Sequence, residues 1–209
     1  EENTKENYAK GIFIAPDNLK IGAPAIAALG LETTLYELDI HKHRNNDCYY
    51  HIGFAYEIAS ILNRKVTLPD MSYKTVNDDV NNYISLEIDT PKCPYYTGRM
   101  ATNLTIKESP KFIKKRLIDA GMRPINNVID ISNYVMLEFC QPLHFFDKDT
   151  LGTKIVVRDA YENEKLVTLD NNERVLKASD IVITDGKKSI CLAGVMGGLN
   201  TEVTENTKN

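Results

Sequence analysis

One stretch predicts most about this chain: Asp130-Ile-Ser-Asn-Tyr-Val-Met-Leu-Glu-Phe-Cys-Gln-Pro-Leu-His-Phe-Phe-Asp147. It carries His144, the only histidine beyond residue 51, and it places Ser132 and Asn133 on a segment with helical apolar spacing. Further along, Leu192-Ala-Gly-Val-Met-Gly-Gly198 is a glycine-framed loop where a ligand can lie against bare backbone. The two segments together predict a pocket for a small molecule or for the end of a nucleic acid.

The composition is that of an ordinary globular chain. Its 209 residues are 43% hydrophobic with a net charge of −4, which argues against a protein that coats nucleic acid by bulk electrostatics. No apolar run approaches the roughly 20 residues that span a bilayer, and no signal peptide opens the chain. The four cysteines lack C-x-x-C spacing. We therefore expect reduced thiols in a cytoplasmic protein with no membrane partner, with Cys140 and Cys191 in the core.

We divide the chain into a polar tail (1–10), a partial first-domain segment (11–69), a linker of loop composition (70–80) and a larger domain (81–209). The first-domain segment is expected to be a small α+β piece. Its apolar patterns predict strands at Gly11–Pro16 and Leu35–Ile40 and an amphipathic helix over 51–63.

Strand patterns dominate the larger domain. Alternating or β-branched runs predict strands at Tyr83–Ile88, Lys154–Arg158, Lys165–Leu169, Ile181–Thr184 and Ser189–Leu192, with a further β region over 93–106. One helix is predicted from an N-cap at Ser109, followed by Pro110, to Gly121, and a second over 127–139. Helices grouped before a run of strands indicate an α+β fold, with mixed or antiparallel sheets and a few flanking helices.

One cluster has the residue types of a metal site. His41, His43, Cys48 and His51 are all zinc-ligand types, but a structural zinc site usually shows cleaner paired spacing. The neighbours Lys42, Arg44 and Asn45 suit a solvated loop equally well. We assign no metal site, and zinc remains the alternative.

Two further features have both a functional and a structural interpretation. The stretch Lys92–Arg123 carries an excess of lysine and arginine, with Tyr95 and Tyr96 inside it, so it is either a face for RNA phosphates or a solvated helix surface. The loop Ala193–Gly198 lacks the spacing of a dinucleotide site, and it is either a ligand-binding loop or a tight turn. A lone histidine among apolar neighbours, such as His144, is more often a core residue than a catalyst.

Four sequence strings carry a resemblance to a known family: Arg123-Pro-Ile-Asn-Asn-Val-Ile-Asp-Ile-Ser-Asn-Tyr-Val-Met-Leu-Glu, Gln141-Pro-Leu-His-Phe-Phe-Asp, Leu166-Val-Thr-Leu-Asp and Leu192-Ala-Gly-Val-Met-Gly-Gly. They resemble the B3/4 editing domain of bacterial phenylalanyl-tRNA synthetase beta subunits. The segment 11–68 also resembles part of the first domain of those subunits. The resemblance covers nearly the whole chain, as an internal part of a longer polypeptide.

The resemblance implies a proofreading hydrolase that removes tyrosine wrongly attached to tRNA(Phe). It implies that Ser132 and Asn133 contact the aminoacyl group or the terminal adenosine. It also implies that His144 is catalytic, lying near the ester and helping to hold the hydrolytic water or the ribose. Ala193, Gly194 and Gly197 would line the pocket for the tyrosine side chain. The implied partners are the 3′ end of tRNA(Phe) and the alpha subunit, in a heterotetramer. No cofactor is implied for this fragment, since ATP and Mg²⁺ belong to the synthetic site of the whole enzyme.

The sequence departs from the family pattern near His144. Cys140 stands where the family usually has glycine, and Phe145 where it usually has alanine. The family's tyrosine-reading glutamate is expected to fall just past Asn209. These departures support an alternative, in which the domain is a non-catalytic scaffold or tRNA-docking module of the same subunit with a decayed pocket.

Overall fold

The computed structural model describes residues 17–209, so the predicted tail (1–10) and the predicted strand Gly11–Pro16 lie outside the described residues. The chain forms two compact units, each built from two stretches of sequence. The first unit contains 17–68 and Glu108–Leu143, and the second contains Pro69–Lys107 and His144–Asn209. The domain boundaries drawn from the sequence stay predictions.

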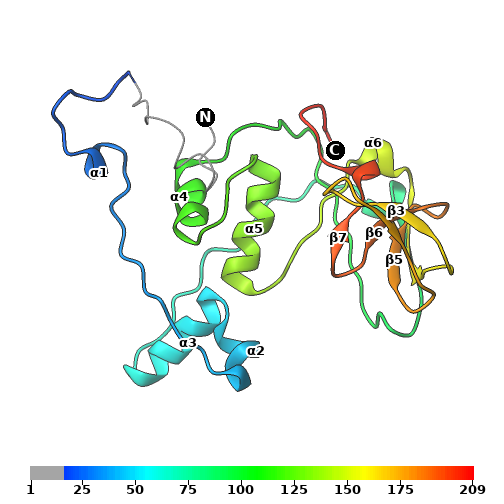
Figure 1. Cartoon of the computed structure of the whole chain (residues 1–209), viewed down its shortest axis with the longest axis horizontal. Helices are drawn as coiled ribbons and strands as arrows, with labels where there is room; N and C mark the ends of the chain where they lie inside the picture. Colours follow the sequence, from blue (N-terminus) through cyan, green and yellow to red (C-terminus); the bar gives the residue numbers. More distant parts are fainter. Residues whose placement is uncertain (1–16) are drawn as a thin grey trace. The chain divides into compact units, whose positions relative to one another are not determined.

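The described part of the first unit is helical (Figure 1). Its elements are α1 (Ala25–Ala28), the 3-10 turn η2 (Lys42–Arg44), α2 (Asn45–Cys48), α3 (His51–Ile61), α4 (Lys111–Asp119) and α5 (Asn127–Phe139). Helices α4 and α5 pack side by side around the buried Ile113, Leu117 and Val128 (Figure 1). The helices predicted over 51–63, 110–120 and 127–139 are therefore confirmed.

The ends of α4 and α5 are set by local signals, one of which differs from the prediction. Asn126 caps α5 by accepting hydrogen bonds from the Val128 and Ile129 amides, and Gly121 ends α4 in a left-handed conformation (φ +76°). The predicted N-cap role of Ser109 is wrong. Its hydroxyl donates instead to the buried carboxylate of Asp130 at 2.5 Å. Asp130 also accepts the Ile125 amide at 2.7 Å, so it joins the start of α4 to that of α5.

The strand predicted at Leu35–Ile40 is wrong, because this segment runs without strand pairing. Leu35 is 65% exposed and Tyr36 is 81% exposed, so neither set of alternating side chains is buried. A strand needs a neighbour to accept its backbone hydrogen bonds. The described residues of this unit contain no other strand to provide one.

The second unit is built on a five-stranded mixed sheet with the order β1-β2-β5-β6-β7 (Figure 1). The strands are β1 (Ser85–Asp89), β2 (Lys154–Asp159), β5 (Ile181–Thr184), β6 (Ser189–Leu192) and β7 (Met196–Gly197). β1 runs parallel to β2, and the other pairs are antiparallel. A separate ribbon pairs β3 (Lys165–Val167) with β4 (Glu173–Val175), while α6 (Lys148–Leu151) and the 3-10 turns η3 (Val80–Asn82) and η4 (Leu199–Thr201) flank the sheets.

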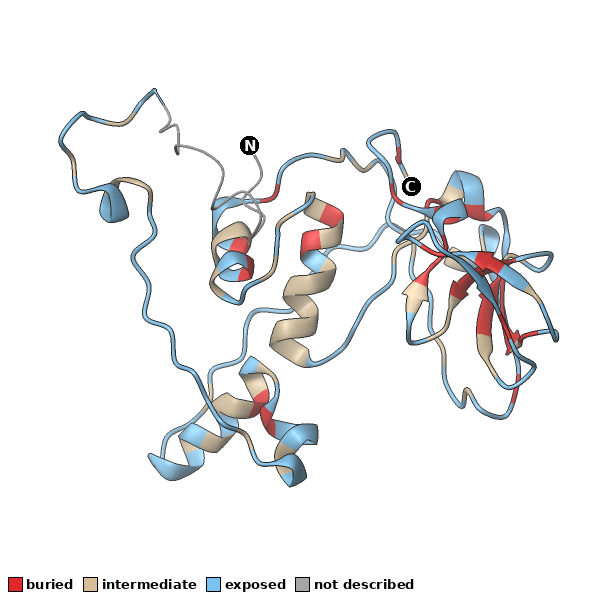
Figure 2. Cartoon of the chain, viewed as in Figure 1, coloured by how far each residue is buried: buried red, intermediate tan, exposed pale blue. Residues whose placement is uncertain are grey.

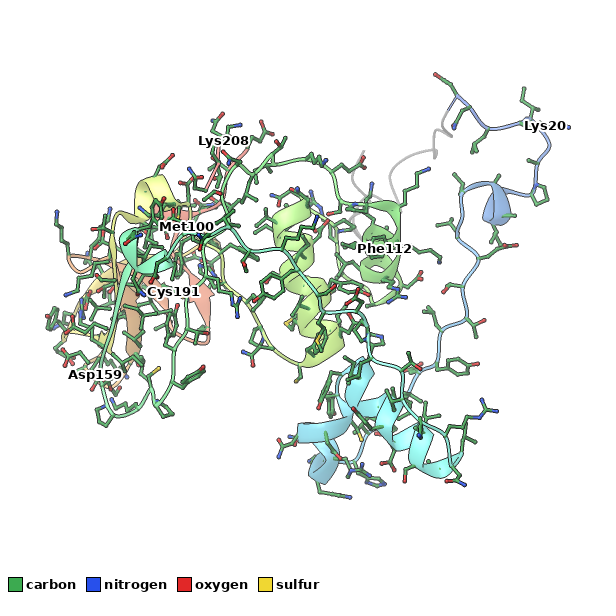
Figure 3. The ribbon with its side chains drawn as sticks, turned by 180° about the vertical axis from the view of Figure 1, so that it is seen from behind. Lys20, Met100, Phe112, Asp159, Cys191 and Lys208 are labelled. Carbon is green, nitrogen blue, oxygen red and sulfur yellow. The ribbon has the colours of Figure 1, made fainter. Side chains whose placement is uncertain are left out.

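The core of this unit lies on the central strands of the sheet, where the buried residues are concentrated (Figure 2). One cluster contains Leu151, Ile155, Val157, Ile183, Ile190 and Cys191, and a second contains Ala160, Leu166, Leu176 and Val182. Cys191 is one of the side chains labelled on the sheet in Figure 3. β-Branched residues dominate these strands because they pack well on a pleated surface. The α+β fold expected from the sequence is confirmed.

Several finer expectations are wrong. The region 93–106 contains no strand, the predicted strand at Lys165–Leu169 ends at Val167, and β4 and β7 were not predicted. Cys191 is buried as expected, but Cys140 is exposed, with φ +58° just after α5. None of the helices between residues 17 and 209 could span a bilayer.

Candidate functional site

The glycine-framed loop is the tip and second strand of the β6–β7 hairpin. Leu192 pairs with Met196 and Cys191 with Gly197, which leaves Ala193, Gly194 and Val195 as the loop. Gly194 has φ +71° and nothing within 4 Å of the position of a Cβ, so the turn needs its backbone freedom. The side chain of Ala193 packs instead against the cluster around Cys191.

Gly197 has a different role, because it lies against the imidazole of His144. A Cβ at Gly197 would overlap Cε1 of His144 and stand only 2.9 Å from its Nε2 and 3.1 Å from Leu169 Cδ1. The histidine and the glycine strand, which are far apart in the sequence, therefore meet in direct contact. Any side chain at position 197 would displace the ring.

Two residues outside the predicted set, Phe146 and Leu169, complete the surroundings of His144. The ring of Phe146 meets the imidazole edge-on, with centroids 4.5 Å apart and planes at 69°. Leu169 approaches Gly197 from the turn after β3. The spacing of His144 and Phe146 by two residues was a usable signal for the first contact. Nothing local in the sequence points to the second.

These apolar neighbours affect the electrostatics of the imidazole. His144 keeps an exposed part, yet burial on its packed side lowers the pKa of the ring below its ordinary value. The neutral imidazole is thus the form that the site favours near neutral pH. A neutral imidazole has one nitrogen that donates and one that accepts a hydrogen bond, so it can take a proton from water.

The segment that carries His144 is tied to the residues that follow Gly197. The Asp147 amide donates to the Thr201 carbonyl at 3.1 Å, and the Asp147 carboxylate accepts the Thr207 hydroxyl at 2.5 Å. The same carboxylate caps α6 by accepting the Asp149 amide at 2.9 Å. These bonds hold the two segments in register, which keeps His144 opposite Gly197.

Glycine is required at position 198 for a separate structural reason. A Cβ there would stand 2.6 Å from the Ile190 carbonyl oxygen, which accepts the Gly198 amide at 2.7 Å. Since the obstacle is backbone, a side chain at this position has no room. Gly198 therefore fixes the strand that presents Gly197.

Ser132 and Asn133 lie on α5 in the first unit, where both are half-buried. The Ser132 hydroxyl donates to the Leu143 carbonyl at 2.9 Å and so fastens the chain that leaves α5. The other predicted site residues, His144, Ala193, Gly194 and Gly197, belong to the second unit. Within that unit the structure brings His144 and Gly197 together, while Gly194 is exposed at the loop tip.

The remaining candidate features have structural partners. In the predicted zinc cluster, the rings of His41 and His43 stack, and His51 Nδ1 lies 2.9 Å from the Leu137 carbonyl. No three metal-ligand side chains gather anywhere in 17–209. In the basic stretch, Lys115 pairs with Asp119 at 3.0 Å, Lys114 pairs with Glu108, and Arg116 donates to the Tyr134 hydroxyl at 2.7 Å. The charges of Lys114 and Lys115 on α4 are therefore balanced locally.

A surface hollow of the second unit lies elsewhere. It is lined by Val76, Asn77, Asp78, Val80, Tyr83, Met100 and Thr102, and it includes none of the predicted site residues. The candidate site is therefore the contact surface around His144 rather than this hollow.

Comparison with known proteins places these features in context. A family model described as the B3/4 domain matches residues 92–209. The phenylalanine–tRNA ligase beta subunit of Geobacillus kaustophilus is 48% identical over 204 residues, which cover 97% of this chain and 25% of that protein. The beta subunits of Bacillus subtilis and Staphylococcus haemolyticus are 45% identical over 205 residues and 47% identical over 204 residues. Each of these matches covers 97% of this chain and 25% of the relative.

The chain thus spans about a quarter of the length of the curated relatives it matches. A solved structure, an N-terminal fragment of the phenylalanyl-tRNA synthetase beta subunit from Pyrococcus horikoshii, is 17% identical with a TM-score of 0.40. It covers 81% of this chain and 52% of its own. The resemblance drawn from the motifs is confirmed by the identities to the beta subunits.

Proposed function

This chain belongs to the B3/4 domain family, and we propose that its domain hydrolyses the ester between tyrosine and tRNA(Phe) within a phenylalanine–tRNA ligase. The observation that carries the proposal is the contact between the His144 imidazole and the backbone of Gly197. It joins a group that can accept a proton to the glycine hairpin, whose tip at Gly194 is exposed and free of side-chain bulk. These are the two features that water attack on a bound ester requires.

The proposed chemistry is simple because an aminoacyl ester is already activated. A water oxygen attacks the carbonyl carbon of the ester while its proton passes to the neutral imidazole of His144. The carbon–oxygen bond to the terminal ribose then breaks, and the ribose oxygen takes a proton to become a hydroxyl group. Holding the water in place supplies much of the rate, so neither a protein nucleophile nor a cofactor enters the proposed reaction.

Such a reaction has a clear use in a phenylalanine enzyme. Tyrosine differs from phenylalanine by one hydroxyl, and a pocket shaped for an apolar ring rejects an added hydroxyl by only about a hundredfold. A second site that hydrolyses the wrong ester corrects the remainder. In this proposal Ser132 and Asn133 contact the aminoacyl group or the terminal adenosine, and Ala193, Gly194 and Gly197 border the amino-acid side chain.

The proposal extends to partners and location. The relatives are named as beta subunits of a tRNA ligase. We propose that this chain likewise acts in the cytoplasm with an alpha subunit, in a heterotetramer that receives the 3′ end of tRNA(Phe). ATP and Mg²⁺ would serve the synthetic site of that assembly.

The test measures release of tyrosine from Tyr-tRNA(Phe) by the complete ligase that contains this chain. We expect His144→Ala to slow the release by about 10²-fold, the lower end of what general acid–base catalysis contributes. The exposed Glu173→Gln variant should release tyrosine at the wild-type rate. Wild-type release by His144→Ala would overturn the proposal.

A second candidate is a non-catalytic docking module, and one observation favours it. The imidazole fills the space over Gly197, which closes that part of the surface to a ligand in this conformation. A docking module would retain affinity for tRNA but would not release tyrosine from Tyr-tRNA(Phe) above the rate in buffer. The same assay, run beside a tRNA-binding measurement, separates the two candidates.

A further inference from the structure

We infer that Phe146 is a positioning residue that holds the His144 imidazole against Gly197. This inference rests on the proposed function, because it explains how the proposed base is oriented. The ring of Phe146 presses edge-on against the imidazole at 4.5 Å, and Gly197 limits the same ring through its bare backbone. Contacts from two residues leave the imidazole less rotational freedom than a histidine without such neighbours has.

Phe146 is itself well fixed. Its side chain packs against the core cluster that includes Leu151 and Ile190. The next residue, Asp147, is held through its amide by the Thr201 carbonyl and through its carboxylate by the Thr207 hydroxyl. A ring anchored in the core forms a rigid wall. It can therefore define the orientation of a more exposed neighbour.

The contact also shapes the surroundings of the imidazole. Phe146, Gly197 and Leu169 offer no charge to stabilise an imidazolium. The carboxylates next to these residues have other partners. Asp147 accepts the Thr207 hydroxyl and the Asp149 amide, while Asp170 is bonded by Thr168, Asn172 and Arg174. The walls around the ring therefore favour its neutral form, which is the form able to accept a proton.

A double-mutant experiment in the complete ligase tests this inference. Phe146→Leu keeps an apolar side chain but removes the aromatic edge. We expect deacylation of Tyr-tRNA(Phe) to lose about 10-fold in kcat with KM nearly unchanged, since misplacing a catalytic group affects the chemical step. In a His144→Ala background, Phe146→Leu should have no further effect, because its action passes through the imidazole.

The matched control is Phe112→Leu on α4, whose ring is labelled in Figure 3 and makes an edge-on contact with Tyr134. It removes a similar aromatic pair outside the site, so its kcat should equal that of the wild type. Phe146→Tyr keeps the ring and should restore most of the rate. The Tm of each variant shows whether a lower rate is caused merely by unfolding of the protein.

A second readout does not depend on activity. Proton NMR follows the titration of the His144 ring, whose midpoint should rise when Phe146→Leu lets water reach the imidazole. If Phe146→Leu left both kcat and the titration midpoint of His144 unchanged, the inference would be overturned. It would also be overturned if the double mutant lost activity by the product of the losses of Phe146→Leu and His144→Ala. Wild-type activity of His144→Ala would instead overturn the proposed function, so the two failures are distinguishable.

Discussion

The imidazole of His144 occupies the place that a side chain at Gly197 would need. A Cβ on that glycine would overlap the ring at Cε1 and approach Nε2 to 2.9 Å. Glycine at this position is thus required by a neighbour, and not by its backbone angles. This separates Gly197 from Gly194 in the same hairpin, whose left-handed conformation is the reason for glycine.

The first prediction concerns Gly197→Ala. The added methyl group pushes the imidazole away, and this overpacking should cost about 1–3 kcal/mol of unfolding free energy. Denaturant unfolding measures the effect. In a His144→Ala background the cost should become much smaller, since only the Leu169 contact at 3.1 Å remains.

The control for Gly197→Ala is Gly98→Ala, where the nearest atom to a new Cβ is Leu86 Cδ1 at 3.7 Å. That is an ordinary contact, so the variant should be close to neutral. If Gly197→Ala destabilised equally with and without the imidazole, the contact with His144 would not explain the glycine.

The sequence predicts those parts of the fold that depend on local signals. The apolar stripe of α5 lies within one segment, and so do the β-branched runs of β2 and β5. The strand predicted at Leu35–Ile40 fails because strand formation depends on a partner that the segment itself does not specify. The two-residue strand β7 is too short to show any alternation.

The candidate site likewise has features that the sequence predicts and features that only the fold creates. His144 and the glycine loop are visible in the sequence as unusual residues, but their contact is set by the sheet and by the bonds of Asp147 to Thr201 and Thr207. The roles of Gly194 and Gly197 could not be separated beforehand, because one is local and the other depends on a distant ring. The contribution of Leu169 depends likewise on the position of the β3–β4 ribbon.

The second prediction concerns pH. Burial lowers the pKa of folded His144 below the value of about 6.5 for an unfolded chain. At pH values between these two pKa values, the unfolded chain binds more protons at this residue than the folded chain does. The contribution of His144 to the free energy of unfolding therefore falls as the pH drops from about 6.5 through the folded pKa. The stability of the wild type relative to His144→Ala should therefore decrease on acidification from pH 7 to pH 5.

Urea unfolding at several pH values measures this difference. Gly98→Ala, which leaves the imidazole and its neighbours in place, should follow the wild type across the range. A difference between wild type and His144→Ala that stayed constant or grew at acidic pH would show that burial does not disfavour the charged ring.

The third prediction uses the exposed Cys140, which follows α5 with φ +58°. Left-handed backbone is unfavourable for a residue with a Cβ and readily adopted by glycine. Cys140→Gly should therefore raise the unfolding free energy by about 1 kcal/mol. Calorimetry measures the accompanying rise in Tm. Cys140→Ala removes the thiol but keeps the Cβ, so an equal rise in that variant would rule out the backbone explanation.

The fourth prediction concerns the ion pair between Arg158 and Glu164, whose side chains are 11% and 13% exposed and whose charged atoms lie 2.8 Å apart. Glu164 also accepts the Ser189 hydroxyl at 2.5 Å and the Tyr161 amide at 2.9 Å. Glu164→Gln leaves the guanidinium without its counter-charge and should cost about 3 kcal/mol, as is usual for a broken buried pair. Glu173→Gln, which breaks the exposed pair with Lys165, should cost less than about 1 kcal/mol.

The same pair makes a prediction for acid stability. Hydrogen bonding to Arg158 lowers the pKa of Glu164 from 4.5 to about 2. The contribution of the ionised Glu164 carboxylate to the free energy of unfolding is therefore complete above about pH 4.5. It is lost as the pH falls through about 2. Wild type and Glu164→Gln should converge in unfolding free energy over this interval. The pair links β2 to the turn before β3, and through Ser189 it reaches β6. Convergence would therefore show that the ionised carboxylate in this link stabilises the fold.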